Sequence, residues 1–466
     1  MFLKIKKIHF IGIGGIGMSG IAEILINKGF IVSGSDETPS ENTDHLLNLG
    51  ATIYFHHHHD NVQNTDLIVY SAAIDINTNI EILTAKQLSI PIIRRAEMLA
   101  EISRLNYTIA VAGTHGKTTA TSMLALTLIQ SGIDPTVVVG GRLKDLGGTN
   151  ARLGQGDWSI VEADEYDRSF LQLTPTIAVI NNIEPEHLDI YSNFKDLLET
   201  FEKFANMTPF YGYIAACIDC EGVKQLIPSL RKKIYTYGLS DGADYQAKNI
   251  TYKISSSISN LFSTQCDVYE FGQLLGRLVL NVPGEYNIVN ALVTVLVARQ
   301  FDINFDIIAN VIAEFRGAFR RFEIKGIKKI NDEFSAIIVD DYAHHPTEIK
   351  ATLKGAKQYL DKRIIAIFQP HTFTRTRDFY KDFANAFVDA DIVYITDIYP
   401  ARETPIPNIT SDIIFQEAKN QGHNNIYYVP DMDQLFDIVN KILKPNDVLI
   451  TMGAGDIWKF GERILK

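Results

Sequence analysis

The chain has 466 residues, of which 46% are hydrophobic and 21% are charged. These fractions are close to the averages of soluble globular proteins, which excludes disordered, fibrous and disulfide-scaffold classes. A chain of this length is too long for one hydrophobic core, so we expect about three domains. The formal net charge of -11 opposes broad binding to nucleic acid or anionic membranes. We therefore expect small molecules as partners, with no nucleic acid and no membrane.

The cysteines indicate a reducing compartment. Cys217, Cys220 and Cys266 are too few and too scattered for a disulfide framework, so we expect a cytoplasmic protein. The spacing of the first two would also suit zinc or redox chemistry, but only one further thiol remains, and incidental strand cysteines are the favoured interpretation. The histidine run 56–59 is interpreted as a polar loop rather than a metal site.

The first predicted unit begins with lysines and an apolar stretch, which superficially resembles a secretory signal. Glycines interrupt the apolar run, so we favour a buried strand over 8–13 that enters a glycine turn. A helix over 19–28 and a strand over 30–33 follow. This order predicts a strand–helix–strand unit with a parallel sheet.

The glycine turn of this unit has the spacing of a dinucleotide-binding loop. Gly12, Gly14 and Gly17 fit G-x-G-x-x-G, and Asp36 lies near the position where such proteins bind a ribose hydroxyl. Taken alone, the motif indicates NAD or FAD binding, or a purely structural turn. The turn could equally hold a diphosphate that is part of a substrate.

The second predicted unit carries a stronger signal. A strand over 108–112 precedes a loop, 113–119, and a helix over 119–131. Glycines let the loop direct N–H groups at phosphate oxygens, and the helix amino terminus adds partial positive charge. Lys117 can then reach the β- and γ-phosphates, and the Thr118 hydroxyl can bind magnesium. The loop is a shortened variant of the usual phosphate loop, and phosphate binding is favoured over a structural turn.

Further strands are expected over 158–162 and 177–181, and the polar tract 240–265 is predicted to form antiparallel strands or loop rather than helix. Glu162 closes the first of these strands, and His187 lies in a later loop. A carboxylate and a histidine there could complete metal sites beside a triphosphate, although each residue alone is more often a solvated loop residue.

The third predicted unit starts near residue 315. Strands are expected over 336–339, 364–368, 392–396 and 448–452, with a helix over 378–388. The whole chain is therefore predicted to be α/β with three domains: a Rossmann-like amino-terminal domain at 1–106, a central phosphate-loop ATPase domain at 107–314, and a Rossmann-like carboxy-terminal domain at 315–466.

Six motifs together make the chain similar to a known family, and the resemblance extends from residue 8 to about 456. They are Gly-Ile-Gly-Gly-Ile-Gly-Met-Ser-Gly at 12–20, Gly-Thr-His-Gly-Lys-Thr-Thr at 113–119, Glu-Ala-Asp-Glu at 162–165, Arg-Arg-Phe-Glu at 320–323, Asp-Asp-Tyr-Ala-His-His-Pro-Thr-Glu at 340–348 and Gln-Pro-His-Thr-Phe-Thr-Arg-Thr-Arg at 369–377. In this combination they resemble the Mur ligases.

The resemblance implies an activity. A first domain would hold a UDP-sugar, the central domain ATP, and the third would close over both. The implied reaction joins L-alanine to the lactyl carboxylate of UDP-N-acetylmuramate with ATP and Mg²⁺, through an acyl phosphate, in cell-wall synthesis. A monomer or weak homodimer is expected.

The resemblance also implies roles for matching residues, which we state as expectations. The catalytic residues would be Lys117, Arg321, His344 and His345. The ATP site would comprise Gly113, Thr114, His115, Gly116, Lys117, Thr118, Thr119, Asn287, Asn290, Arg321 and Asp341. The UDP-substrate site would comprise Gly12, Gly14, Gly15, Gly17, Asp36, His371 and Arg375. The metal site would comprise Thr118, Glu162 and His187.

One residue departs from the family pattern, and the role of another stays open. Tyr286 stands where the family often has histidine, and Lys203 is a candidate for a carbamylated lysine, although a solvated helix residue is favoured. Three alternatives to the implied reaction remain. They are a ligase that recycles murein tripeptide onto the same sugar nucleotide, an NAD-dependent oxidoreductase, and a regulatory nucleotide-binding protein without chemistry.

Overall fold

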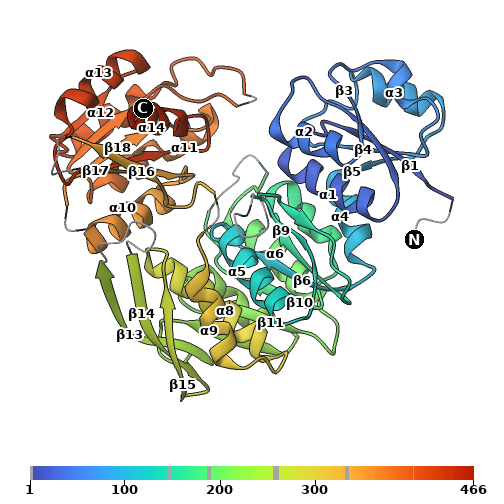
Figure 1. Ribbon diagram of the computed structural model, residues 1–466, viewed down its shortest axis with the longest axis horizontal. Helices are drawn as coiled ribbons and strands as arrows, with labels where there is room; N and C mark the ends of the chain where they lie inside the picture. Colours follow the sequence, from blue (N-terminus) through green and yellow to red (C-terminus); the bar gives the residue numbers. More distant parts are fainter. Residues whose placement is uncertain are drawn as a thin grey trace. The chain divides into compact units, whose positions relative to one another are not determined.

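The computed structural model describes residues 4–141, 143, 148–185, 190–254, 262–317, 319–330, 335–360, 362–401 and 403–466. Its strands form three sheets of five, ten and six strands, shown in Figure 1. Contacts divide the chain into two compact units. The first consists of Met1–Lys248, Asp267–Leu278 and Val289–Glu314, and the second of Asn249–Cys266, Val279–Ile288 and Phe315–Lys466. The expected α/β class is confirmed, and the domain limits stay predictions.

The five-stranded sheet has the order β3-β2-β1-β4-β5, and every neighbouring pair is parallel. Its elements are β1 (Lys7–Ile11), α1 (Ile16–Asn27), β2 (Ile31–Ser35), α2 (Glu41–Asn48), β3 (Thr52–Tyr54), the 3₁₀ helix η1 (His59–Val62), β4 (Leu67–Tyr70), α3 (Ile80–Gln87), β5 (Ile92–Arg94) and α4 (Arg95–Ser103). The strand order reverses at β1, because β2 and β3 follow on one side of it and β4 and β5 on the other. In parallel sheets a ligand crevice forms at the carboxyl ends of strands at this point.

Helices cover both faces of this sheet because the residues of β1 alternate between two cores. Ile8 and Phe10 belong to the core that includes Ile21 of α1, whereas Ile11 packs on the other face with Ile82 of α3. All are fully buried, and burying each such side chain stabilises the fold by roughly 1.5–3 kcal/mol. The buried strand that we expected in place of a secretory signal is therefore present as β1.

The ten-stranded sheet has the order β15-β14-β13-β12-β11-β10-β6-β9-β7-β8. Its elements are β6 (Tyr107–Ala112), α5 (Lys117–Gln130), β7 (Thr136–Val138), β8 (Ala151–Arg152), β9 (Trp158–Ala163), the 3₁₀ helix η3 (Tyr166–Gln172), β10 (Ile177–Ile180), α6 (Phe194–Asn206), β11 (Tyr213–Cys217), α7 (Glu221–Leu226), the 3₁₀ helix η4 (Ile227–Ser229), β12 (Ile234–Gly238), β13 (Tyr245–Ile254), β14 (Phe262–Glu270), β15 (Gln273–Leu280), α8 (Glu285–Arg299) and α9 (Phe305–Glu314). The central strand β6 pairs in parallel with β9 and β10. The order reverses at β6, which places the loop after this strand at a second ligand crevice.

The six-stranded sheet has the order β16-β17-β21-β18-β19-β20, in which only β16 runs antiparallel to its neighbour. Its elements are β16 (Glu323–Lys329), β17 (Ser335–Asp341), α10 (Pro346–Leu360), β18 (Ile364–Phe368), α11 (Phe373–Ala384), the 3₁₀ helix η6 (Asn385–Phe387), β19 (Ile392–Ile395), α12 (Asp412–Asn420), β20 (Ile426–Tyr428), α13 (Met432–Ile442), β21 (Val448–Met452) and α14 (Trp458–Leu465). One face packs on α10 and α11, and the other on α13 and α14.

The predicted strands agree well with the structure, and three helix starts were wrong. The helix expected from residue 119 begins two residues earlier, at Lys117. Strands β18 and β21 have the expected limits, and the polar tract forms β13 and β14. The helix expected over 378–388 instead begins at Phe373, because the Thr372 side chain caps it by accepting from the N–H of Arg375. Helix α1 begins at Ile16 rather than at residue 19, with Gly15 as its extended N-cap and Gly17 already inside the helix.

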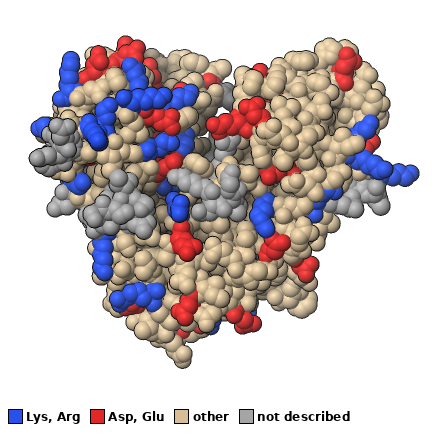
Figure 2. All heavy atoms as spheres, in the orientation of Figure 1, with Lys and Arg blue, Asp and Glu red and all other residues tan. Residues whose placement is uncertain are grey.

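Charged side chains are interspersed on the face drawn in Figure 2, where basic and acidic residues lie close to one another. None of the helices within the described ranges has the length and apolar character needed to cross a membrane.

Candidate active site

The first glycine turn lies directly after β1. Gly12 has φ +83°, and a Cβ there would lie 3.2 Å from Cβ of Ser71, which follows β4. Asp36 closes the turn from the end of β2: its Oδ2 accepts from the N–H of Gly14 at 2.7 Å, and its Oδ1 accepts from the N–H of Glu37 at 2.8 Å. Oδ2 therefore braces the glycine turn, and the bond from Glu37 fixes the orientation of the carboxylate.

The turn leads into the start of α1, where two backbone amides are open. The N–H of Gly15 reaches the carbonyl of Gly12 at 3.3 Å. Within the described residues, no acceptor takes the N–H of Ile16 or Gly17, which are the first two residues of α1. Unpaired amides at a helix amino terminus attract anions through their partial positive charge. The structure thus brings Gly12, Gly14, Gly15 and Gly17 together in one turn, and we refer to this turn as the first anion cradle because its open amides suit an anion; the predicted binding itself stays a prediction.

The second loop follows β6 and has the geometry expected of a phosphate loop. Gly113 and Gly116 have φ values of +146° and +79°. A Cβ on Gly113 would lie 3.1 Å from the backbone N of Asn182. The Asn182 amide braces the loop, since its Oδ1 accepts from the N–H of His115 at 2.7 Å and from the hydroxyl of Thr114 at 2.8 Å. Glycine is needed at both positions, and the loop is fixed before any ligand binds.

Lys117 is the first residue of α5, and its ammonium group is already engaged. It donates to the carbonyl of Gly113 at 2.7 Å and to Oε2 of Glu165 at 2.6 Å. The Glu165 side chain is fully buried and that of Lys117 is 16% exposed. Tyr191 donates its hydroxyl to the backbone carbonyl of Glu165 at 2.6 Å, which fixes the segment that carries this carboxylate. A phosphate would reach Lys117 in competition with Glu165.

The expected metal-binding residues lie close together where they are described. Glu162 is next to the last residue of β9, and its Oε2 lies 2.5 Å from where a Cβ on Gly140 would be. A Cβ on Gly141 would meet the Thr118 methyl group at 3.1 Å. Glu162 and Thr118 therefore face the same two-glycine segment. His187 lies outside the described residues.

The expected adenine contacts lie on α8. Asn287 and Asn290 are three residues apart and so share one face of the helix. A Cβ on Gly116 would lie 2.9 Å from Oδ1 of Asn290, which places this amide against the phosphate loop. Asn287 donates to the carbonyl of Pro283 at 2.6 Å. Next to it, Tyr286 lies over Gly284, and burial raises the pKa of its hydroxyl.

In the second unit, the end of β17 carries a buried carboxylate. Asp341 accepts from the N–H groups of Phe322 and Ala343 at 2.9 and 2.8 Å. Burial raises the pKa of this carboxyl to about 6, and the nearby Arg321 guanidinium opposes the shift. Arg321 donates to Oε1 of Glu348 at 3.5 Å. Its expected contact with phosphate and the expected contact of Asp341 with ribose stay predictions.

Three further predicted residues meet at the carboxyl edge of the same sheet. The rings of His344 and His371 lie 5.8 Å apart. Burial lowers the pKa of both imidazoles, that of His371 to about 4, and the Arg375 guanidinium lowers both further. Both rings are therefore neutral at pH 7. The Glu348 carboxylate accepts from the backbone N–H of His344 at 3.0 Å and holds this segment at the start of α10.

The two neighbouring histidines of this segment, His344 half-buried and His345 buried, hold their ring protons on different nitrogens. The Nδ1 of His344 lies 2.9 Å from the carbonyl oxygen of Tyr342, which can only accept, so Nδ1 carries the proton and Nε2 holds the lone pair. The Nδ1 of His345 instead accepts from the N–H of Thr347 at 3.4 Å, which places the proton of its neutral form on Nε2. His344 thus presents an acceptor at Nε2 and His345 a donor.

Sequence reasoning missed three residues of these sites: Glu165, Asn182 and Glu348. Glu165 and Glu348 stood in the quoted motifs, whereas Asn182 did not. Glu165 and Asn182 lie two residues after a strand end, and Glu348 lies in the first turn of α10. That position is a usable signal, because parallel strands gather such side chains at one edge. It could not reveal that Glu165 holds Lys117.

The structure also describes the cysteines, Lys203 and the histidine run that the sequence analysis considered. Cys217 is buried at the end of β11, where burial raises the pKa of its thiol to about 12, and Cys220 accepts from the N–H of Ile183. Lys203 is exposed on α6. In the histidine run, His57 pairs with buried Glu81 at 2.9 Å, whereas His58 and its neighbour are exposed.

Comparisons with known proteins assign the family. Three family models match in chain order: "Mur ligase family, catalytic domain" at residues 7–107, "Mur ligase middle domain" at 111–298 and "Mur ligase, glutamate ligase domain" at 320–455. The chain belongs to the Mur ligase family. Mur ligases use ATP, so the nucleotide expected at the second loop is supported for this family member.

Among its relatives, a UDP-N-acetylmuramate–L-alanine ligase from Geobacter sp. (strain M21) is 47% identical over 466 residues, covering 100% of this chain and 98% of the relative. A protein of the same name from Geotalea uraniireducens (strain Rf4) is 46% identical with 100% and 99% covered. A solved UDP-N-acetylmuramate–alanine ligase from Thermotoga maritima matches with a TM-score of 0.82 and 30% identity, covering 98% of each chain. A murein peptide ligase from Psychrobacter arcticus 273-4 matches with a TM-score of 0.70 and 25% identity, again over 98% of each. The predicted three-domain α/β fold is confirmed.

Proposed function

We propose that this Mur ligase joins L-alanine to the lactyl carboxylate of UDP-N-acetylmuramate at the expense of ATP. Identity of 46 to 47% to ligases of that name, over the whole chain, supports this choice of substrates. The observation that carries it in the structure is the pair of anion cradles in one unit, one after β1 and one after β6, since the reaction needs a sugar nucleotide and a triphosphate.

A carboxylate does not condense with an amine until its oxygen becomes a good leaving group. In the proposed reaction the carboxylate attacks the γ-phosphorus of ATP, ADP leaves, and an acyl phosphate forms. The amine of alanine then attacks the acyl carbon, and the tetrahedral intermediate expels inorganic phosphate. Lys117 holds the phosphates, the first amides of α5 add partial positive charge, and Arg321 offsets charge on the transferred group.

The residues near the phosphate loop fit a magnesium ion. Thr118 and Glu162 offer hard oxygen ligands beside the same glycines, which is the donor type that Mg²⁺ prefers. These two residues, with His187, would hold the ion, which supplies electrostatic stabilisation of the phosphate oxygens when bound.

Amine attack requires a group that accepts a proton at neutral pH. His344 suits this role better than His345, because its Nε2 carries the lone pair and its lowered pKa keeps the ring neutral. His371 and Arg375 lie beside it and are proposed to contact the acceptor substrate. Because these groups and Lys117 belong to different units, we propose that substrate binding assembles them and excludes water.

The matches of the family models support the limits proposed for the three domains, 1–106, 107–314 and 315–466. We also propose that the protein acts in the cytoplasm and contributes to peptidoglycan synthesis, as a monomer or weak homodimer.

The test is a phosphate-release assay with ATP, Mg²⁺ and UDP-N-acetylmuramate against alanine, serine, glycine and murein tripeptide. Release that requires both the sugar nucleotide and alanine is expected, and Lys117→Ala should abolish it. Turnover with the tripeptide but not with alanine would instead identify the recycling ligase. ATP binding without substrate-dependent release would indicate a regulatory protein.

A further inference from the structure

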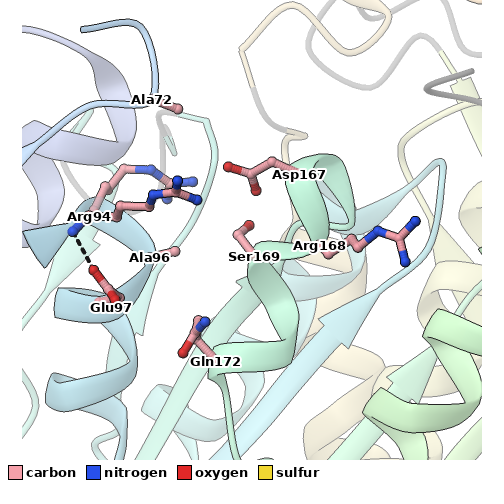
Figure 3. A pocket seen from close by; sticks show the side chains of 9 residues that line it. Ala72, Arg94, Ala96, Glu97, Asp167, Arg168, Ser169 and Gln172 are labelled. Carbon is pink, nitrogen blue, oxygen red and sulfur yellow. Dashed lines mark hydrogen bonds between the residues drawn. The ribbon is translucent and has the colours of Figure 1, made fainter. Parts of the chain in front are cut away.

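The cavity at the start of α4 belongs to the substrate site proposed above, because Arg95, which lines it, lies against Gly17 of the first glycine turn. It has a volume of about 120 Å³, and Arg94 and Asp167 line it from opposite sides (Figure 3). The backbone N–H of Arg94 donates to Oε2 of Glu97 at 2.6 Å, which fixes this end of α4. A different cluster of side chains, in the segment that joins β3 to β4, belongs to none of the sites described above.

This segment is held from its inner side by buried polar groups. The side-chain amide of Asn61, in η1, donates to the carbonyl of His56 at 2.9 Å and to Oε1 of Glu81 at 2.7 Å. The Nδ1 of His57 lies 2.9 Å from Oε2 of the same carboxylate, and the Glu81 side chain is fully buried. These three contacts fix the backbone of a short segment, so the side chains on its exposed side are presented from a fixed base.

Three side chains, His58, His59 and Asp60, converge on the exposed side. Two imidazole nitrogens and a carboxylate oxygen of this cluster all lie within 4.8 Å of one another. The Nδ1 of His58 is 3.4 Å from Oδ2 of Asp60, and the Nδ1 of His59 is 3.0 Å from Oδ1. The centroids of the two rings are 4.0 Å apart. All three residues are exposed, so an ion can reach them directly from solvent.

These separations suit a transition-metal ion. Nitrogen and oxygen ligands about 2.0–2.1 Å from a tetrahedral zinc ion lie roughly 3.3–3.4 Å from one another. The Nδ1 of His58 holds its lone pair in the plane of the ring, since it accepts from the backbone N–H of Asp60 at 3.3 Å. Within the described part of the chain, no hydrogen bond joins either imidazole to the Asp60 carboxylate. Two acceptors therefore face each other at 3.4 Å without a proton between them, and a cation would satisfy both.

The surroundings of the cluster favour metal binding. The Nε2 of Gln63 donates to Oδ1 of Asp60 at 2.7 Å and orients the carboxylate, as the outer partners of metal ligands typically do. The bond of 3.3 Å that the His58 ring accepts is long, because N–H donors usually lie about 2.9–3.0 Å from their acceptors. A metal ion can therefore displace this bond at little cost. This convergence is what a bare run of histidines in the sequence could not indicate.

We propose that His58, His59 and Asp60 form a surface site for a divalent transition-metal ion, with zinc as its ligand. Two imidazoles and one carboxylate supply three ligands, and water completes the coordination. Imidazole ligands suit zinc, copper and nickel, whereas magnesium prefers oxygen ligands. The site is thus chemically different from the magnesium site proposed beside the phosphate loop. It is also independent of the ligase reaction.

The position of the cluster predicts what the ion does. Glu81, which holds η1 from the inside, also accepts from the hydroxyl of Ser35 at 2.6 Å. The Ser35 carbonyl in turn accepts from the N–H groups of Gly12 and Ile13 at 2.8 and 3.0 Å. The ligands converge only in the folded chain, so an ion that binds them stabilises the folded form over the unfolded one. We expect zinc to stabilise the five-stranded sheet and the segments tied to it.

Titration calorimetry of the chelator-treated full chain with zinc chloride tests the proposal. The wild type should take up one more equivalent at micromolar concentration than the double variant His58→Gln with His59→Gln. Asp60→Asn keeps the shape of the side chain and removes its charge. It should weaken this step about tenfold or more, because even the outer partners of metal ligands are worth about 10- to 100-fold in affinity. Magnesium chloride should give no step that these substitutions remove. Zinc should raise the thermal unfolding temperature of the wild type more than that of the double variant.

His56→Gln is the matched control, because it removes an exposed histidine of the same run that lies outside the cluster. It should keep both the additional equivalent and the thermal shift. If the double variant binds as many equivalents as the wild type, the ion binds elsewhere and the site is refuted. If His56→Gln loses the step to the same extent as the double variant, the run binds zinc without regard to its geometry, and the proposal is equally wrong.

Discussion

The Lys117–Glu165 pair allows a stability role and a phosphate role to be separated in one experiment. Lys117→Ala removes the cation that faces a fully buried carboxylate. Breaking a buried ion pair by deleting one partner typically costs about 3–5 kcal/mol, because the remaining charge has no compensation. A carboxylic acid with an ordinary pKa can instead take up a proton at pH 7 for about 3.7 kcal/mol. We expect a loss of about 3 kcal/mol in the free energy of unfolding of the central domain.

The double variant Lys117→Ala with Glu165→Gln should reverse this loss. Glutamine keeps the size of the side chain and removes the carboxylate charge that faced Lys117, so most of the stability should return. Phosphate release should not return, because no ammonium group then reaches the β- and γ-phosphates. Urea unfolding followed by tryptophan fluorescence measures the first effect, and the phosphate-release assay measures the second.

Two results would contradict this reasoning. If Lys117→Ala were as stable as the wild type, the buried contact would carry no energy and the geometry of the pair would be irrelevant. If the double variant regained turnover together with stability, the lysine would act only through folding. Lys203→Ala, a change at an exposed lysine on α6, serves as the control and should alter neither quantity.

Three further changes follow from the geometry. Gly116→Ala should abolish ATP binding measured by calorimetry, since its Cβ would lie 2.9 Å from Oδ1 of Asn290. The control Gly132→Ala has a similar φ of +81° but no neighbouring atoms at its Cβ. It should lower the free energy of unfolding by about 1–2 kcal/mol and leave ATP binding intact. Asp36→Ala should raise KM for the sugar nucleotide more than tenfold and leave KM for ATP unchanged, because only the first loop loses its brace. Burial lowers the pKa of His371 in the folded protein to about 4, so on acidification the unfolded chain takes up a proton at this residue before the folded protein does. The contribution of His371 to the free energy of unfolding should be fully present above pH 6.5 and be lost between pH 6.5 and 4. In His371→Asn, the urea midpoint should fall less over the same pH range.

Much of the fold and the two cradles could be predicted from the sequence because the signals are local. Glycine spacing after a β-branched strand fixes a turn and a helix start within a few residues, so Gly12 and Gly113 lie where expected. The same holds for β18 and β21, whose apolar runs are buried on both faces and are followed within two residues by Pro370 and Gly453. Nothing beyond neighbouring residues is needed for these assignments.

Side-chain partners could not be predicted in this way, because they depend on how segments distant in sequence meet. Arg320 and Arg321 are adjacent and chemically equal in the sequence. In the structure, Arg320 donates to buried Asp340 at 2.9 Å and to the carbonyl of Gly455 at 3.0 Å, which occupies it structurally. Arg321 instead donates to Oε1 of Glu348 at 3.5 Å, although both guanidinium groups lie near the Tyr342 ring.

The buried carboxylate of Glu165 also competes with ATP, and this competition can be measured. In the described state the Lys117 ammonium donates to Glu165 at 2.6 Å, so a phosphate must displace a charged partner before it binds. Glu165→Gln leaves an acceptor of the same shape without the charge, and a charged hydrogen bond is stronger than a neutral one by about 1 kcal/mol. We therefore expect the Kd for ATP to fall about five-fold in this variant, measured by calorimetry without magnesium. An unchanged or higher Kd would mean that Glu165 helps to present Lys117 to the phosphate, and the competition argument would be wrong.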